Sequence, residues 1–335
     1  RQRHLTIPCE MCIRDSIQAI QERRRERLAA RPERALAELD DELEPEEGRV
    51  VVRHGASLAV EDAHGHLIHC LARRNIGHVV CGDRVVWQRL PDGQGVVTAI
   101  LPRTSALSRP DYSGRDKPLA ANLTRLAILI APEPEPSGYL IDQYLVAAEL
   151  IGVEAILVGN KMDLLAGPAE RAAFQARFAH YGAIGYRTFW ISLLEPESIG
   201  GLVAELAGQT SVLVGQSGVG KSSLVKLLLP DQEIQIGRLS QATGLGRHTT
   251  SAATCYRLSG DGFLIDSPGV RSFRLGAIDR DGLQQGFREF QPYLGRCRFG
   301  NCRHDHEPDC AIRQAVADGQ IAPERLANFH HLLSD

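Results

Sequence analysis

Long apolar runs are missing from this sequence of 335 residues. No stretch approaches the roughly 18 consecutive apolar residues that a membrane-spanning helix needs, and the N-terminus lacks the basic, apolar and small-residue succession of a signal peptide. The net charge is only -3, which excludes a uniformly basic nucleic-acid binder, although a local basic patch stays compatible with this total. We therefore expect a cytoplasmic protein that has neither a membrane nor DNA as a partner.

Aromatic residues are also scarce, at 5% of the chain, and the eight cysteines are unevenly placed. Three of them fall within fourteen residues near the C-terminus. Without a secretion signal, this clustering favours a reduced protein with a metal site over a disulfide framework. The chain is 43% hydrophobic, so it can bury cores, and its length predicts two or three domains.

A phosphate-binding loop is predicted within residues 212–229, which have the pattern of a strand, a glycine-rich loop and a helix. The loop fits G-x-x-x-x-G-K-[ST], in which glycines let backbone N–H groups surround the phosphates. Lys221 can reach the outer phosphates and the Ser222 hydroxyl can ligate Mg²⁺. The apolar strand and helix on either side disfavour an accidental glycine-rich turn. The predicted nucleotide-binding residues here are Val214, Gly215, Gln216, Ser217, Gly218, Val219, Gly220, Lys221 and Ser222.

A second motif, N-K-x-D, comprises Asn160, Lys161, Met162 and Asp163 after an apolar run. Asp163 can accept hydrogen bonds from guanine N1–H and the 2-amino group, which adenine does not offer in that place. Asn160 can hold the other edge of the base, and the Lys161 stem can lie over the ring. With the phosphate loop, this motif predicts GTP and GDP as ligands and disfavours an ATP-dependent phosphotransferase.

A third motif, D-x-x-G, starts at Asp266, which can hold Mg²⁺, and ends at Gly269, whose N–H can sense the γ-phosphate. A Mg²⁺-coordinating threonine belongs between the phosphate loop and this motif. Thr249 and Thr250 both stand there, and we favour Thr250. Since N-K-x-D comes about fifty residues before the phosphate loop, the GTPase is predicted to be circularly permuted, with D-x-x-G leading into the C-terminal segment.

A metal site is predicted near the C-terminus, where Cys297, Cys302, His304 and Cys310 have the spacing C-x₄-C-x-H-x₅-C. Three thiolates and one imidazole complete a tetrahedral Zn²⁺ set and leave no open position, so one structural zinc ion is expected. His306 is a less favoured alternative ligand. Three other cysteines are expected to be ordinary core residues: Cys70, Cys81 and Cys255.

The predicted fold is multidomain and begins with residues 1–47, an extension with an arginine-rich helix and an acidic tract. Within it, residues 1–16 lack any periodic pattern and are interpreted as foreign to the native chain. The arginines fit either a solvated tail or an arm on RNA phosphates. Residues 48–105 contain five short β-rich runs, which predict an OB-type barrel that binds RNA.

Trp87 is the only aromatic residue of the predicted barrel strands, and it fits the core as well as a base-stacking surface. Arg73 and Arg74 are candidate phosphate contacts. A polar linker is expected at residues 103–118. Strand and helix then alternate, so residues 106–275 are predicted to form the GTPase domain, a mainly parallel sheet with helices on both faces. Helices are expected at 139–151, 169–180 and 199–207, and the zinc domain, residues 276–335, should carry helices at 281–290 and 311–317.

The combination of barrel, permuted GTPase and Cys₃His segment resembles the ribosome small-subunit-dependent GTPase A (RsgA) family of bacterial ribosome-assembly factors. The residues that carry the resemblance are CGDRVVW, RTSALSRPD, NKMD, GQSGVGKSSL, GLGRHTT, DSPGVRSF and CRFGNCRHDHEPDCAIR. The resemblance implies GTP hydrolysis stimulated by the 30S subunit, a role in late maturation of that subunit, and 16S rRNA contacts by the barrel and zinc domain. We expect a monomer whose nucleotide state controls binding and release.

Two positions depart from common GTPase patterns. Val270 stands where many GTPases carry a water-orienting glutamine, so intrinsic hydrolysis should be slow. His248 is the nearest polar candidate for a catalytic role, and a switch-loop histidine without catalytic duty is the alternative. Ser192, followed by two leucines, takes the place of the guanine-supporting Ser-Ala pair. The alternative function is a GTP-dependent RNA-binding module with negligible turnover.

Overall fold

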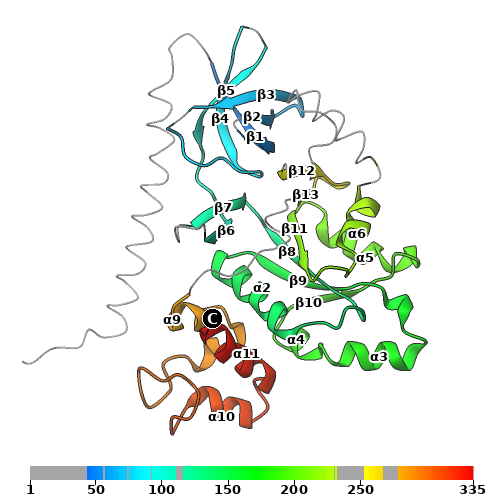
Figure 1. The fold of residues 1–335 in the computed structure, drawn as a ribbon, viewed down its shortest axis with the longest axis vertical. Coiled ribbons are helices and arrows are strands. Elements are labelled where there is room, and N and C mark those ends of the chain that lie inside the picture. The colour runs from blue at the N-terminus through cyan, green and yellow to red at the C-terminus, as the bar shows by residue number, and fades with distance from the viewer. Residues whose placement is uncertain are drawn as a thin grey trace, which may run out of the picture.

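The computed structural model describes residues 44–55, 57–73, 75–91, 93–110, 116–229, 231, 253–266 and 278–334. In Figure 1 a β-barrel lies at the top, an α/β layer in the middle, and a helical C-terminal part at the bottom. The arginine-rich stretch predicted near the N-terminus, residues 1–16 and Arg74 lie outside the described residues.

The N-terminal barrel has five strands: β1 (Pro45–His54), β2 (Ser57–Glu61), β3 (Leu67–Ala72), β4 (Arg84–Arg89) and β5 (Gly95–Ile100). Their order is β1-β2-β3-β5-β4, and pairing of β1 with β4 closes the barrel as predicted. Trp87 is fully buried in the barrel core, so it is a packing residue. Gly95 makes room for it, because a Cβ there would lie 2.8 Å from the Trp87 ring.

The central sheet contains β8 (Arg125–Ile130), β9 (Glu154–Gly159), β10 (Arg187–Trp190), β11 (Thr210–Gly215), β12 (Ala253–Arg257) and β13 (Phe263–Asp266). The order β10-β9-β8-β11-β13 is parallel throughout, and antiparallel β12 follows β13. β8 and β11 are buried at every position, which fits the apolar runs at 126–130 and 212–215 that make up most of each strand.

The barrel and the central sheet form one hydrogen-bonded sheet of eleven strands. β1 pairs with β12 at Val52↔Thr254 and Arg53↔Ala253, so a barrel strand continues the GTPase sheet. The Cys81 thiol also donates to the Ala253 carbonyl at 3.0 Å. Cys70, Cys81 and Cys255 are all buried, which confirms that they are core residues.

The expected polar linker at residues 103–118 is wrong, because this segment contains most of a β-hairpin. β6 (Ala106–Pro110) pairs with β7 (Asp116–Ala121), and an isolated bridge joins Cys81 to Ala120. Leu107, Leu119 and Ala120 are buried in the main core. The few apolar residues of this polar segment therefore suffice for strands because they pack against a neighbouring domain.

The helices of the central layer are α2 (Gly138–Ile151), α3 (Pro168–Ala176), α4 (Ala179–Ala183), α5 (Gly200–Leu206) and α6 (Lys221–Leu228). The single helix expected at 169–180 is wrong, since two short helices occupy this region. The chain turns at Phe178, which leaves helical geometry at φ -109 and ψ 5. Among the described residues, no helix combines the length and apolar character required to cross a bilayer.

The C-terminal part contains α9 (Arg280–Gln285), a 3₁₀ segment η3 (Arg288–Tyr293), α10 (Ala311–Ala317) and α11 (Pro323–Ser334). The helix expected at 281–290 is therefore also wrong, since α9 ends before Gly286. A Cβ at Gly286 would lie 2.5 Å from Val146 of α2, so the chain approaches α2 too closely for a larger residue. The helix expected at 311–317 is confirmed by α10.

Helix α2 lies between the parallel sheet and the C-terminal part (Figure 1). Asp142 of α2 is completely buried, and its carboxylate pairs with the Arg325 guanidinium at 2.6 Å. Arg325 also donates to both Glu289 carboxylate oxygens, at 2.5 and 3.0 Å. Asp142 accepts further hydrogen bonds from the Tyr181 hydroxyl at 2.7 Å and the Asn328 amide at 2.6 Å. We call Asp142, Glu289 and Arg325 the buried ionic junction.

Candidate nucleotide and metal sites

The predicted nucleotide motifs lie at one edge of the central sheet. The N-K-x-D motif follows β9, Ser192 follows β10, the phosphate loop follows β11, and Asp266 ends β13. These four strands run parallel, so their carboxyl ends meet at the same edge. The permuted order along the chain therefore converges in space on one site.

The phosphate loop has the backbone that its glycines predict. Gly215, Gly218 and Gly220 have φ values of 135, 88 and 93°, which L side chains rarely adopt. Space is restricted too, since a Cβ at Gly215 would lie 2.2 Å from the Leu129 carbonyl oxygen and one at Gly220 would lie 2.3 Å from the Asn160 amide nitrogen. α6 then begins at Lys221 and directs its N-terminal N–H groups toward this loop.

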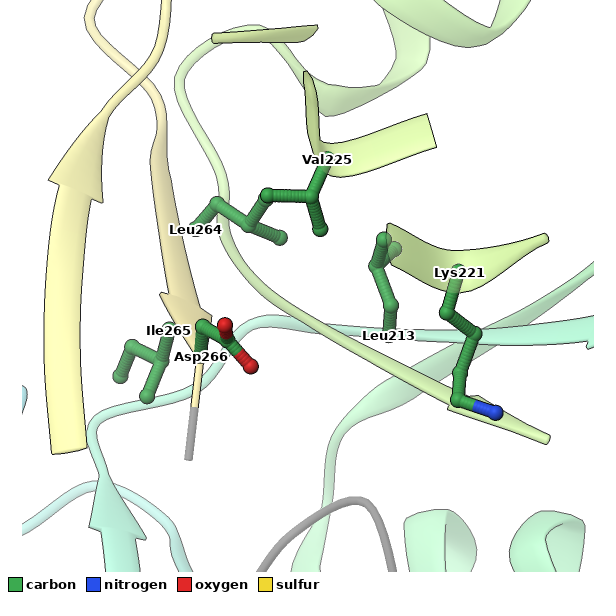
Figure 2. Close-up of a pocket in the computed structure, with 6 residues that line it drawn as sticks. All are labelled: Leu213, Lys221, Val225, Leu264, Ile265 and Asp266. Atoms are coloured by element: carbon green, nitrogen blue, oxygen red, sulfur yellow. The ribbon is translucent and has the colours of Figure 1, made fainter. Parts of the chain in front are cut away.

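Lys221 and Asp266 lie on opposite sides of a small pocket between α6 and β13 (Figure 2). The Lys221 ammonium donates to the carbonyl oxygens of Gly215 at 2.8 Å and Gln216 at 2.5 Å, so its charge is already held against the phosphate loop. Ser222 is exposed at the first turn of α6. A hydroxyl and a carboxylate at one end of a phosphate loop are the ligand types that Mg²⁺ takes in a nucleotide site.

The residues predicted to read guanine are held by hydrogen bonds to neighbouring loops. The Asn160 amide donates to the Val219 carbonyl of the phosphate loop at 2.9 Å, and the buried Asn160 Oδ1 has no partner among the described atoms. The Ser192 hydroxyl donates to the Asp163 carboxylate at 2.5 Å. Lys161 adopts the left-handed conformation and donates to the Glu133 carbonyl at 3.2 Å. A buried unpartnered acceptor and an oriented carboxylate fit a guanine base, which offers several N–H donors.

Three predicted nucleotide-binding residues direct their side chains elsewhere. Val214, Val219 and Met162 are buried in the main hydrophobic core, so only their backbone groups are available to a ligand. Ser217 and Gly218 are exposed on the phosphate loop. In the loop after β10, the Leu194 N–H donates to the Ser192 hydroxyl at 3.1 Å, while the Leu194 side chain is exposed.

Several predicted residues lie outside the described part of the chain. These are the two candidate Mg²⁺-binding threonines, the candidate catalytic histidine, and the glycine and valine of the D-x-x-G segment: Thr249, Thr250, His248, Gly269 and Val270. Their roles remain predictions.

The contacts that join the phosphate loop to α2 could not be predicted from local sequence patterns. The Gln216 side-chain amide donates to the Glu135 carbonyl at 3.1 Å, and its oxygen accepts the Ser137 N–H at 3.2 Å. Ser137 is the N-cap of α2, and its hydroxyl accepts the Leu140 N–H at 3.3 Å. The phosphate loop is therefore hydrogen-bonded to the N-cap residue and the preceding loop of α2, the helix that carries Asp142 of the buried ionic junction.

The C-terminal cysteine and histidine residues form one cluster in space. The ligand atoms of Cys297, Cys302, His304 and Cys310 all lie within 4.8 Å of one another. The sulfur atoms of Cys297 and Cys310 are 3.8 Å apart, and His304 Nδ1 lies 3.3 Å from the Cys310 sulfur. Two thiolates on a tetrahedral zinc ion with bonds of about 2.3 Å would be separated by about 3.8 Å. His306 is exposed beside Asp305 and lies outside this cluster.

The chemistry of this donor set also fits zinc. Burial raises the pKa of the Cys302 thiol to about 12, so the protein environment by itself favours the neutral thiol. A divalent cation reverses that preference, because thiolates are the form that binds zinc. The cluster has four protein ligands, which leaves no position for a catalytic water.

Comparison with known proteins gives relatives along almost the whole chain. The model of the RsgA GTPase family matches residues 100–276. The chain is 45% identical over 320 residues to the small ribosomal subunit biogenesis GTPase RsgA of Pseudomonas aeruginosa, covering 95% of this chain and 94% of the relative. It is 46% identical over 324 residues to the protein of that name from Azotobacter vinelandii, again covering 95% and 94%.

Solved structures give the same assignment. YjeQ from Thermotoga maritima superposes with a TM-score of 0.72 and 30% identity, covering 87% of this chain and 98% of YjeQ. YloQ, described as a circularly permuted GTPase, superposes with a TM-score of 0.69 and 26% identity, covering 87% and 94%. These matches confirm the permuted fold that the motif order predicted. The chain belongs to the RsgA GTPase family of GTP hydrolases.

Proposed function

We propose that this protein binds the small (30S) ribosomal subunit and acts in its late maturation, hydrolysing GTP to GDP and phosphate with stimulation by the subunit. The observation that carries the GTPase assignment is the convergence of N-K-x-D, Ser192, the phosphate loop and Asp266 on one sheet edge. The relatives, whose names describe GTPases of small-subunit biogenesis, support the ribosomal assignment.

In this proposal, the nucleotide is bound by the residues predicted from its motifs. Asp163, oriented by Ser192, reads the guanine base, and Asn160 links the base site to the phosphate loop. Lys221 moves from the carbonyls that it contacts here to the outer phosphates. Ser222 and Thr250 ligate Mg²⁺, with Asp266 beside them. His248 takes part in hydrolysis, and the Gly269 N–H senses the γ-phosphate.

The remaining assignments are proposals about partners and domains. The barrel and the zinc domain contact 16S rRNA, and one structural Zn²⁺ occupies the Cys₃His cluster. The protein acts as a cytoplasmic monomer that does not bind DNA. Its functional units are an extension at 1–47, an RNA-binding barrel at 48–105, a GTPase domain at 106–275 and a zinc domain at 276–335.

Nucleotide state is proposed to control the affinity for the 30S subunit. Two routes connect the nucleotide site to the zinc domain: the segment after Asp266 along the chain, and α2 in space. α2 contacts Gln216 of the phosphate loop at its N-cap residue and the buried ionic junction farther along. A change in the phosphate loop that shifts α2 would therefore also shift the zinc domain.

The test is GTP turnover by the purified protein alone, with 30S subunits, and with 50S subunits as the control. Strong stimulation by 30S subunits alone is expected. Turnover that no subunit changes, with GTP still bound, would contradict the proposed function and favour an RNA-binding module that uses GTP as a ligand.

A further inference from the structure

Phe299 is the only phenylalanine, tyrosine or tryptophan among the described residues whose side chain is exposed, with 42% of it accessible. It lies in the loop that joins the zinc-cluster residues Cys297 and Cys302. An isolated exposed apolar residue needs no explanation by itself. The hydrogen bonds of its loop and the arginines near it distinguish Phe299 from an ordinary exposed apolar residue.

Hydrogen bonds hold the backbone of this loop in the conformation that exposes the ring. The Cys302 N–H donates to the Phe299 carbonyl, and the Arg298 N–H donates to the Asp309 carbonyl, both at 3.2 Å. The Arg280 guanidinium donates to the Cys302 carbonyl at 3.3 Å. A ring held outward by such a loop can bind a partner with little ordering cost.

The loop that carries the exposed ring is rich in arginine, and the acidic residues Asp305, Glu307 and Asp309 follow it along the chain. Arg296, Arg298 and Arg303 are exposed, and residues 296–303 contain no acidic residue. The Arg298 guanidinium carbon lies 5.5 Å from the centre of the Phe299 ring, and this side chain also pairs with Asp309 at 3.1 Å. Aromatic rings beside arginines are the usual means of binding single-stranded RNA, because bases stack on the ring and phosphates contact the guanidinium groups.

The described part of the barrel exposes no phenylalanine, tyrosine or tryptophan ring. Its one tryptophan, Trp87, is fully buried, and its exposed rings are the imidazoles of His64 and His66. Two of its exposed arginines are paired with glutamates, Arg84 with Glu47 at 2.5 Å and Arg89 with Glu46 at 3.6 Å. Among the described phenylalanine, tyrosine and tryptophan residues, the zinc loop therefore carries the most exposed ring.

We propose that Phe299 stacks on an unpaired nucleobase of the small-subunit rRNA, with Arg296 and Arg303 contacting the flanking phosphates. This inference rests on the proposed function, because it identifies the kind of RNA element that the zinc domain recognises. The site requires an unstacked base, so a loop, bulge or junction is its target and a continuous helix is excluded.

The experiment measures the affinity of the zinc-loaded, full-length protein for purified 30S subunits with a non-hydrolysable GTP analogue. Three substitutions of the ring are compared: Phe299→Ala, Phe299→Leu and Phe299→Trp. Stacking predicts binding about tenfold weaker for F299A and F299L, and wild-type or tighter binding for F299W. Val203→Ala, at a similarly exposed apolar side chain on α5, is the control and should bind like the wild type. Zinc content and circular dichroism verify the fold of each variant.

A second readout separates a base from a protein surface. The additional fluorescence of F299W, measured against the wild type, should be quenched by 30S subunits and by a single-stranded oligoribonucleotide. Wild-type affinity for F299L together with weak binding by F299A would indicate an apolar pocket of a ribosomal protein and overturn the proposal. Equal binding by F299A and the wild type would overturn this inference alone. Failure of the wild type to bind 30S subunits would overturn the proposed function as well.

Discussion

The barrel and the zinc domain are attached to the central sheet by different chemistry. The barrel is joined by backbone hydrogen bonds between β1 and β12 and by apolar side chains, including Val52 and Cys81, within the main core. The zinc domain is joined to α2 by the buried ionic junction of Asp142, Glu289 and Arg325, and by Val146 of α2, which is buried in the C-terminal core. The first connection extends a sheet, whereas the second adds a buried charge pair to apolar packing.

This difference suggests that the barrel and the zinc domain differ in how freely they move relative to the central sheet. A continuous sheet and a shared core transmit position rigidly, because interiors are close-packed and cannot deform gradually. A buried ion pair has a high desolvation cost that only good geometry offsets, so it favours a fully docked or an undocked arrangement over intermediate ones. We expect the barrel to remain fixed on the GTPase domain and the zinc domain to be the part whose docking can change.

The largest effect should come from removing zinc. Structural zinc contributes on the order of 10 kcal/mol to small zinc domains, so chelation should unfold residues 278–334 and leave the barrel and sheet folded. Hydrogen exchange would show rapid labelling of α10 and α11 with continued protection of β8 and β11. Loss of protection in the barrel at the same zinc concentration would contradict the expectation that the zinc domain unfolds independently of the barrel.

Arg325→Met should have the next largest effect, because it leaves Asp142 and Glu289 buried without a cation. Breaking a buried ion pair in this way costs about 3–5 kcal/mol. Hydrogen exchange in α11 measures the loss of docking. Arg288→Met is the matched control, because Arg288 also links the C-terminal part to α2, pairing with Glu149 at 2.7 Å. Since the Arg288 side chain is partly exposed, this substitution should cost less than about 1 kcal/mol. Equal effects would refute the special role of the buried junction.

At the barrel connection, Val52→Ala should cost about 2 kcal/mol by leaving a cavity beside β12. The free energy of unfolding of the zinc-loaded protein is measured through the hydrogen exchange of the barrel amides. Leu71→Ala, at an exposed barrel position, should change stability by less than about 0.5 kcal/mol. If Val52→Ala increased amide exchange in α11 more than in the barrel, the proposed difference between the two attachments would be contradicted.

The smallest expected effect is the pH dependence of the stability of the barrel. Burial, together with the positive charges of Arg53, Lys117 and Arg103, lowers the pKa of His78 to about 4. The unfolded chain binds a proton near pH 6.5 and the folded barrel does not, so stability should fall as pH decreases from about 6.5 to 4. His78→Gln should flatten the pH dependence of barrel exchange in this range. An unchanged profile would show that His78 does not control it.

The sequence predicted the conformation and position of the phosphate loop, because both are encoded locally. Gly215, Gly220 and Lys221 specify the loop by their own conformations and charge, and the apolar strand before them fixes its position. The same holds for the zinc cluster, whose four ligands are close in sequence.

The connections between domains could not be predicted in the same way. The sequence pattern of the helix predicted at 139–151 did not indicate that Asp142 is buried, because its partner Arg325 lies 183 residues away along the chain. The β6–β7 hairpin was missed for a similar reason, since Leu107 and Leu119 gain their burial from the core beside them. Tertiary packing decided both cases, and local patterns do not record it.

The most direct test of the central claim is the affinity for 30S subunits with GDP and with a non-hydrolysable GTP analogue. For the wild-type protein we predict tighter binding with the analogue, and for Arg325→Met we predict that the two nucleotides give similar affinities. Equal affinities in the wild type would contradict nucleotide control of the zinc domain. A full nucleotide effect in Arg325→Met would show that the signal does not pass through the buried ionic junction.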